Sequence, residues 1–194
     1  MNPVLSQNIN DAVQVAQSLV ALSGKVTASA RLVADAFLAG NKILVCGNGG
    51  SAAEAAHLTT EFVCRFNRDR PPYPAICLST HGGDLTAIGN DYAFNNVFAR
   101  QVEAFARPGD VLIALSSSGN SENVLRALRA VHRVTGKSIA LLGNGGGLCA
   151  GLADIELVVN SAVTARIQEA HLLIIHTMCE LIEAELARAR TAIQ

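Results

Sequence analysis

The amino-acid sequence predicts an α/β protein, in which helices cover both faces of a doubly wound, five-stranded parallel sheet. The first observation behind this prediction is that five short aliphatic runs recur along the chain, and four of them are almost continuously apolar. Strands that are buried on both faces show this pattern, whereas a sheet with one solvated face gives alternating polar positions. The predicted strands are residues 43–46, 75–78, 111–115, 139–142 and 155–159.

The second observation is that the segments between several of these runs are long enough for crossover helices, as at residues 51–66, 94–106 and 122–135. Strands that alternate with helices along the chain are typical of a parallel sheet. The sequence contains no internal repeat and no linker. Residues 1–194 are therefore expected to form a single domain.

Two segments at the ends of the chain fall outside this alternation, and each is expected to be one long helix. The first reaches to about Leu38 and the second covers about residues 165–189. The second is apolar on more than one face, which a helix lying on one side of a sheet does not usually need. This pattern predicts a subunit interface; the alternative is that a small domain buries the same helix in its own core. Its apolar residues are Ile167, Leu172, Leu173, Ile174, Ile175, Met178, Leu181 and Ile182.

Composition excludes several classes of function. Lys and Arg number 15 against 16 Asp and Glu, so nothing indicates a nucleic-acid partner. The longest apolar run is residues 111–115, far short of the ~20 residues of a membrane span. The N-terminus lacks a secretory signal pattern, which predicts a cytoplasmic protein. The five cysteines show no CxxC spacing and are expected to be small buried hydrophobes.

Ligands of open parallel sheets bind where strands end and helices begin, because loops there present backbone amides and positive helix ends. The loop Gly47-Asn48-Gly49-Gly50-Ser51 follows the first predicted strand. Its glycines allow the backbone to approach a ligand. Ser51 and Glu54 have the spacing of a capping box, which predicts Ser51 as the N-cap of the next helix.

A second loop of this kind, residues 116–121, follows the third predicted strand and reads Ser-Ser-Ser-Gly-Asn-Ser. Its four hydroxyls and the amides of the next helix predict a cradle for phosphate. Because it contains neither lysine nor a Walker pattern, it suits a phosphate that is held while chemistry happens elsewhere. The alternative is an ordinary serine-rich turn.

Side chains suited to metal binding lie on two predicted helices. His57 and Glu61 are four residues apart, so they lie ~40° apart on a helix and could share a metal ion, or form only a hydrogen bond or weak ion pair. On the last helix, Gln168 is ~60° from His171 and ~80° from His176. Spacing does not choose between these two histidines, and either could be a core histidine bonded to a carbonyl.

Together these motifs resemble the sugar isomerase (SIS) domain family, and within it the phosphoheptose isomerases. The motifs are Cys-Gly-Asn-Gly-Gly-Ser at 46–51, His57 with Glu61, Ala-Ile-Gly-Asn-Asp at 87–91, the serine loop at 116–121, and Arg-Ile-Gln-Glu-Ala-His at 166–171 with His176. The resemblance covers nearly the whole chain and implies the flavodoxin-like SIS fold.

The resemblance implies conversion of sedoheptulose 7-phosphate to D-glycero-D-manno-heptose 7-phosphate, for the heptose units of bacterial surface glycans such as lipopolysaccharide. It also implies a cytoplasmic homotetramer with one zinc ion per subunit, held by His57, Glu61, Gln168 and His176. Glu61 and His176 match the family's proton-transfer pair. The implied substrate-binding residues are Asn48, Gly49, Gly50, Ser51, His57, Glu61, Asn90, Asp91, Ser116, Ser117, Ser118, Ser121 and Gln168.

Two positions depart from the family's pattern: Ser117 stands where relatives often have Thr, and Ala165 replaces an acidic residue seen in some of them. The chemistry suits the implied residues, because aldose/ketose isomerisation through an enediol needs a base, an acid and an electrophile. A competing interpretation comes from a branch of the same family, the tetrameric adaptors of the bacterial replication initiator. Those adaptors lack part of the metal set, which is complete here, so the sequence favours the enzyme.

Overall fold

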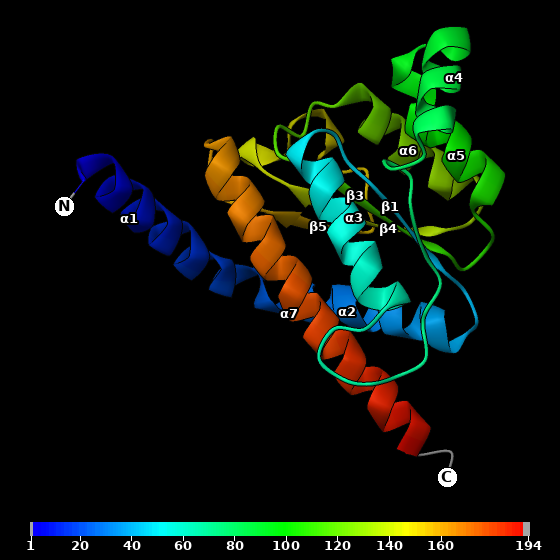
Figure 1. Cartoon of the computed structure of the whole chain (residues 1–194), viewed down its shortest axis with the longest axis horizontal. Helices are drawn as coiled ribbons and strands as arrows, with labels where there is room; N and C mark the ends of the chain where they lie inside the picture. The colour runs from blue at the N-terminus through cyan, green and yellow to red at the C-terminus, as the bar shows by residue number, and fades with distance from the viewer. Residues whose placement is uncertain (1, 192–194) are drawn as a thin grey trace.

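A five-stranded parallel sheet forms the centre of the computed structural model, which describes residues 2–191 (Figure 1). The strand order is β2-β1-β3-β4-β5, and every neighbouring pair is parallel. The predicted doubly wound α/β class is therefore confirmed. The strands are β1 (Ile43–Cys46), β2 (Ala75–Cys77), β3 (Val111–Ser116), β4 (Lys137–Leu142) and β5 (Ile155–Val158).

Helices cover both faces of the sheet, as the continuous apolar strands predict. Alternate residues of a strand point to opposite faces, so Val45 packs into one core and Leu44 into the other. The first core is closed by α2 (Ser23–Leu38), α3 (Gly50–Val63) and α7 (Thr164–Thr191). The second is closed mainly by α5 (Val97–Phe105) and α6 (Glu122–Arg133).

The strand order places two loops at the switch point of the sheet. The chain passes from β1 outward to β2 and then returns to β3 on the other side of β1. Crevices at the carboxyl ends of two such strands are the usual ligand sites of doubly wound sheets. The loop before α3 follows β1, and the serine loop before α6 follows β3, so the fold brings both to this crevice.

The N-terminal segment differs from the single long helix that the sequence predicts. It forms α1 (Pro3–Ser18), a 3₁₀ turn (Leu19–Leu22) and then α2. The Ser18 hydroxyl donates to the Val15 carbonyl at 2.7 Å, a back-bond of the kind that bends helices. Ser23 and Gly24, both weak helix formers, follow directly and favour the break. The last helix, α7, agrees with its prediction.

Two elements were not expected from the sequence, α4 (Gly82–Tyr92) and the 3₁₀ helix η3 (Asn144–Cys149). The helix predicted at residues 94–106 is present, but its first turn is the 3₁₀ helix η2 (Phe94–Asn96). No residue of α4 is buried in the described part of the chain, and α4 projects from the body in Figure 1. The contact of α4 with the second core rests on two partly buried residues, Leu85 and Ile88, and two apolar positions are too few for the sequence pattern to indicate a helix.

The cysteines follow their predicted role with one exception. Cys46, Cys77, Cys149 and Cys179 are buried, and burial raises the pKa of Cys149 to about 11 and that of Cys179 to about 12. These thiols behave as small hydrophobes at neutral pH. Cys64 is exposed at the end of α3, so the prediction is wrong for this residue.

One buried carboxylate fixes the connection between α3 and β2. Glu183 of α7 accepts hydrogen bonds from the backbone amides of Phe66, Asn67 and Arg68 at 3.0 to 3.1 Å, and from Arg70 Nε at 2.9 Å. Burial by itself would raise the pKa of Glu183, but these donors outweigh it and hold the pKa below its ordinary value. The contact ties the loop after α3 to α7.

We expect Glu183→Ala to lower the free energy of unfolding by about 3–5 kcal/mol at neutral pH, because it leaves Arg70 and three amides without their acceptor. Since the folded pKa of Glu183 lies below the unfolded one, its stabilisation is present above about pH 4.3 and is lost as pH falls through the folded pKa. Urea unfolding at several pH values measures this. A difference between wild type and variant that stayed constant from pH 7 to pH 3 would contradict the account.

Candidate functional site

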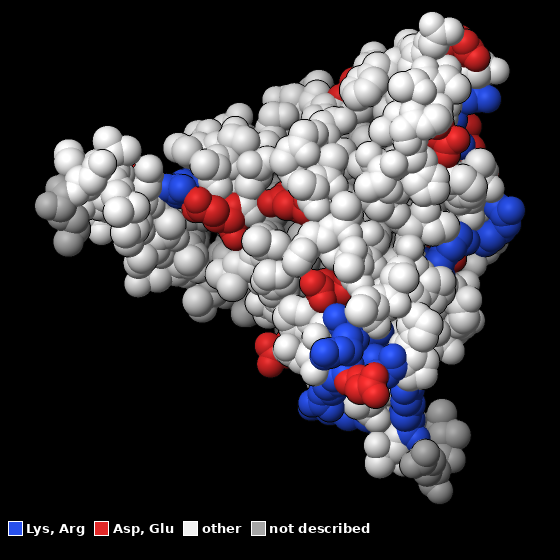
Figure 2. Space-filling view, in the orientation of Figure 1, with Lys and Arg blue, Asp and Glu red and all other residues white. Residues whose placement is uncertain are grey.

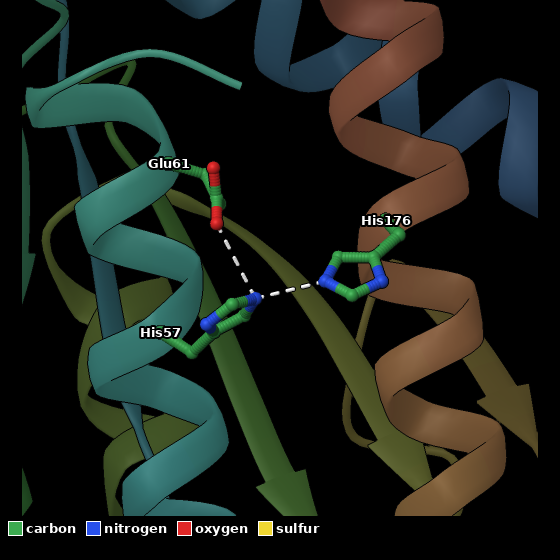
Figure 3. Close-up of side chains that lie close together, drawn as sticks. All are labelled: His57, Glu61 and His176. Atoms are coloured by element: carbon green, nitrogen blue, oxygen red, sulfur yellow. Dashed lines mark hydrogen bonds and ion pairs between the residues drawn. The ribbon is translucent and has the colours of Figure 1, made fainter. Parts of the chain in front are cut away.

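Three side chains with metal-binding atoms meet between α3 and α7 (Figure 3). His57 Nε2 lies 2.8 Å from His176 Nε2 and 3.3 Å from Glu61 Oε1. The three candidate ligand atoms all lie within 4.8 Å of one another. The predicted pair of His57 and Glu61 therefore acquires a third donor from a segment more than a hundred residues away.

Local helix geometry and the packing of two helices produce this cluster. His57 and Glu61 share one face of α3 because they are one helical turn apart, and α7 lies beside α3 in Figure 1. The Phe66 ring stacks against His176, with centroids 5.6 Å apart. Glu61 is mostly buried, with 16% of its side chain exposed, whereas 42% of the His57 side chain is exposed. The cluster therefore opens to solvent on the His57 side.

The donor set fits a zinc ion. Zinc binds imidazole nitrogen and carboxylate oxygen at ~2.0–2.2 Å, so two donors on a tetrahedral ion lie about 3.3 Å apart. The distances from His57 to Glu61 and His176 are close to this value. A tetrahedral ion held by these three donors has one further position, for a fourth protein donor or for the substrate.

The structure distinguishes the two histidines of α7, but it does not test Gln168 as a metal ligand. Of the two histidines on α7, His176 belongs to the cluster and His171 is fully buried. The Gln168 amide packs against Gly50, in the first turn of α3. His57 follows Gly50 by seven residues, about 10 Å along the helix. Gln168 as a fourth metal ligand remains a prediction.

The loop before α3 differs from the prediction at its helix start. The N-cap is Gly49, in the left-handed region with φ of 56°, and no side chain caps the helix. Ser51 is buried within the first turn, so the predicted capping box is wrong. The reason is that Glu54 turns inward to His171 and does not reach back to Ser51. The first amides of α3 are left as donors at the positive end of the helix dipole.

Two residues that the sequence did not single out, Asn123 and Ser79, hold this loop in place. The Asn48 and Asn123 side-chain amides each donate to the other, at 2.8 and 2.9 Å, and so join the first loop to α6. The Ser79 hydroxyl accepts from the Gly47 amide at 3.1 Å and donates to the Gly47 carbonyl at 2.8 Å. Both are tertiary contacts between distant segments, so no local spacing could have indicated them.

The serine loop is ordered by its own hydroxyls. Ser116 Oγ accepts from the Gly119 amide at 3.1 Å and donates to Ser121 Oγ at 3.2 Å, while Ser118 Oγ accepts from the Asn120 amide at 3.1 Å. Ser121 is the N-cap of α6, but its hydroxyl makes no capping bond. This hydroxyl and the first amides of α6 are placed for an anion. Ser117 is half-buried beside them.

The glycine-rich turn η3 packs against the serine loop. Gly119 has a φ of 66° and packs so tightly on Gly146 that a Cβ at this position would overlap the Gly146 carbonyl. The Cys149 amide donates to the Gly119 carbonyl at 2.9 Å, and the Leu148 amide donates to Asn120 Oδ1 at 3.0 Å. The unexpected helix η3 thus braces the candidate phosphate cradle.

The remaining predicted substrate-binding residues, Asn90 and Asp91, lie near the end of α4. Both are exposed, and Asn90 Nδ2 donates to Asp91 Oδ1 at 2.8 Å. The structure does not join them by a hydrogen bond to either loop within residues 2–191. Their part in binding remains a prediction.

Comparisons with known proteins bear on this site. A family model described as the SIS domain matches residues 7–143. The phosphoheptose isomerase of Geotalea daltonii is 50% identical over 165 residues, which cover 85% of this chain and 86% of that protein. The corresponding protein of Campylobacter concisus is 47% identical over 164 residues, covering 84% and 87%.

Solved structures give the same result for the fold. A phosphoheptose isomerase from Francisella tularensis has a TM-score of 0.91 at 36% identity, covering 95% of this chain and 100% of that one. Another, from Neisseria gonorrhoeae, has a TM-score of 0.88 at 40% identity, covering 93% and 97%. Likeness at this level shows that the chain has the same fold as these two isomerases.

Proposed function

The chain belongs to the SIS domain family, and from that premise we propose that its site converts sedoheptulose 7-phosphate to D-glycero-D-manno-heptose 7-phosphate. Relatives that are about 50% identical over most of the chain are named phosphoheptose isomerases, so the protein is an isomerase of this class. The observation that carries the proposal is the meeting of His57, Glu61 and His176 at one opening. The product would supply heptose for bacterial surface glycans.

Glu61 and His176 are proposed to move the proton. Isomerisation takes a proton from C1 of the ketose and returns one to C2 through an enediol, so a base and an acid must face neighbouring carbons. Glu61 has two carboxylate oxygens. Because one of them faces His57, the other is free to take the proton. His176, across the opening, is placed to donate to the sugar oxygen or accept from it.

A zinc ion is proposed to be held by His57, Glu61 and His176, with Gln168 as the fourth ligand, at one ion per chain. When bound, it would polarise the sugar carbonyl and stabilise negative charge on oxygen. Coordination lowers the basicity of a carboxylate, which conflicts with a second duty for Glu61 as the base. Glu61 would serve as the base if its bond to the ion loosened when the sugar oxygens bind.

The two loops at the switch point are proposed to bind the rest of the substrate. The hydroxyls of the serine loop and the amides at the start of α6 suit the phosphate group, since both are donors and the helix dipole favours an anion. The first loop suits the sugar hydroxyls, because Asn48 is oriented by Asn123. The proposed binding set is Asn48, Gly49, Gly50, Ser51, Asn90, Asp91, Ser116, Ser117, Ser118, Ser121 and Gln168.

Incubation with sedoheptulose 7-phosphate and zinc, followed by NMR analysis of the product, tests this function. We expect D-glycero-D-manno-heptose 7-phosphate to form. No turnover with any ketose phosphate would instead favour the adaptor of the replication initiator. That alternative has no support among the relatives named above, which are phosphoheptose isomerases.

We expect Ser121→Ala to raise the KM for sedoheptulose 7-phosphate about tenfold, because a hydrogen bond to a charged group contributes ~1.5–3 kcal/mol. The helix should survive, since this hydroxyl makes no capping bond. Ser118→Ala should behave similarly. Steady-state kinetics measures the effect, with Ser23→Ala at an exposed serine as the control. Unchanged KM values in both loop variants would place the phosphate elsewhere.

A homotetramer is proposed, with α1 as the main contact between subunits. No residue of α1 is buried within the described chain, although Val4, Leu5, Ile9 and Val13 are apolar. Figure 1 shows α1 projecting from the body, and Figure 2 shows its projecting part almost free of charge. Helix α7 offers less apolar surface for such a contact than its sequence indicates, because five of its eight apolar residues are buried in the same chain: Ile167, Ile174, Ile175, Met178 and Ile182.

We expect light scattering to give about four times 20.3 kDa for the wild type and a smaller species for Ile9→Glu. The charge would have to be buried without a partner at the contact, which is costly. Gln14→Glu adds the same charge at an exposed polar position of α1 and serves as the control. A monomeric wild type with full activity would contradict the proposal.

The protein is also proposed to act in the cytoplasm. Among residues 2–191, no helix combines the length and the apolar character needed to cross a bilayer. The proposed substrate carries a phosphate charge, which keeps it from crossing membranes unaided. Enzyme and substrate would then share one compartment. Fractionation of cells that express the protein tests the location.

A further inference from the structure

Two side chains that the proposed chemistry does not use face each other inside the protein. His171 of α7 is fully buried, and neither of its ring nitrogens has a hydrogen-bond partner among residues 2–191. Its Nδ1 lies 3.9 Å from Oε2 of Glu54 on α3, and that oxygen also has no hydrogen-bond partner. Glu54 itself is only 11% exposed at its side chain.

The pair lies between the two ends of the candidate site. On α3, Glu54 is four residues after Gly50 and three before His57, so all three share one face of the helix. On α7, His171 is three residues after Gln168, whose amide packs on Gly50. The seam between the helices therefore carries three contacts in order: the Gln168 contact, the buried pair and the cluster at His57.

A buried polar atom without a partner costs ~1–3 kcal/mol, and native proteins rarely leave several together. At 3.9 Å the two atoms are just beyond hydrogen-bond distance, so a shift of under an ångström would satisfy both. Glu54 belongs to α3 and His171 to α7, so a shift that brings the two atoms together also brings the two helices closer. The pair is thus placed to decide how near α7 approaches α3.

We infer that Glu54 and His171 are positioning residues, whose buried contact sets the approach of α7 to α3 and so the distance between His176 and His57. The inference rests on the proposed function only in that the cluster is taken to bind zinc. Neither residue touches the substrate or the metal in this account. They act through the orientation of ligands that two different helices contribute, as outer partners do in other metal sites.

Calorimetric titration with zinc and ¹⁵N NMR of the imidazole rings in the metal-free protein test the inference. We expect Glu54→Ala and His171→Ala each to weaken zinc binding tenfold or more, the usual cost of losing an outer partner. Binding should still saturate at one ion per chain. The His57 and His176 ring resonances should shift as well. The double variant should be no worse than either single one, because the residues act as one unit.

Ile182→Val, a buried change elsewhere in α7, is the control for stability alone: it should lower the melting temperature and leave zinc affinity and the ring resonances unchanged. If the pair only supports the core, its variants will behave like this control, and the inference is overturned. Glu54→Gln keeps an oxygen acceptor for His171 and should retain most of the affinity, which keeps the test open if the alanine variants do not fold. A wild type that binds no zinc would refute the proposed metal, while the ring resonances would still decide on the positioning role.

Discussion

Glu61→Gln should lower kcat for sedoheptulose 7-phosphate by ~10² or more, because general acid/base catalysis typically contributes 10²–10⁴. The substitution keeps the size of the side chain and one oxygen, but removes the base. KM should change little, since the phosphate is proposed to bind at the serine loop. His176→Gln should behave similarly if His176 is the partner acid. Steady-state kinetics at saturating zinc measures both effects.

Metal content must be measured alongside, because Glu61 is also a proposed ligand. An amide oxygen can still approach the ion, so a variant that keeps zinc and loses turnover has lost the base. Glu180→Gln, an exposed carboxylate on α7, is the matched control and should leave kcat unchanged. Wild-type turnover in Glu61→Gln would refute its assignment as the base.

His57→Ala should reduce bound zinc from about one ion per chain to almost none. His57 lies between the two other donors of the cluster, 2.8 Å from His176 and 3.3 Å from Glu61, so its loss leaves only two of the three donors that meet there. That pair, with Gln168 farther along the two helices, no longer supplies the full tetrahedral set that zinc prefers. Elemental analysis after dialysis measures the metal, and turnover should fall with it.

His81→Ala, an exposed histidine before α4, provides the control and should retain the full amount of zinc. His171→Ala separates a ligand from a positioning residue: at saturating zinc it should still bind one ion per chain, whereas His57→Ala should not. Full zinc content in His57→Ala, or loss of zinc in His81→Ala, would show that the zinc site does not lie between α3 and α7.

The parts of the fold that could be predicted are those with a local signal. Strand β3, residues Val111–Ser116, is buried on both faces and shows this as an unbroken apolar run. The i, i+4 spacing of His57 and Glu61 likewise needs only helix geometry. The break before α2 and the exposed helix α4 could not be predicted from apolar periodicity, since neither feature produces a recognisable change in the spacing of apolar residues.

The site was less predictable, because it depends on contacts between distant segments. Spacing on α7 could not separate His171 from His176, and only the packing of α7 on α3 shows that one is buried with Glu54 and the other joins His57. Asn123 looks like an ordinary polar residue of a helix start, and only the tertiary fold pairs it with Asn48. Glu54 fits the spacing of a capping box, but in the structure it faces the buried imidazole of His171 and not the start of α3.

The origin of the hydrogen at C2 of the product tests the enediol account most directly. The cluster opens to solvent, with 42% of the His57 side chain exposed, so a proton held on Glu61 can exchange with water before it returns to the sugar. Wild-type protein with sedoheptulose 7-phosphate and zinc in heavy water should therefore give an aldose with deuterium at C2, seen as loss of the C2 proton signal in NMR. A product that keeps the hydrogen of C1 completely at C2 would contradict proton transfer through Glu61.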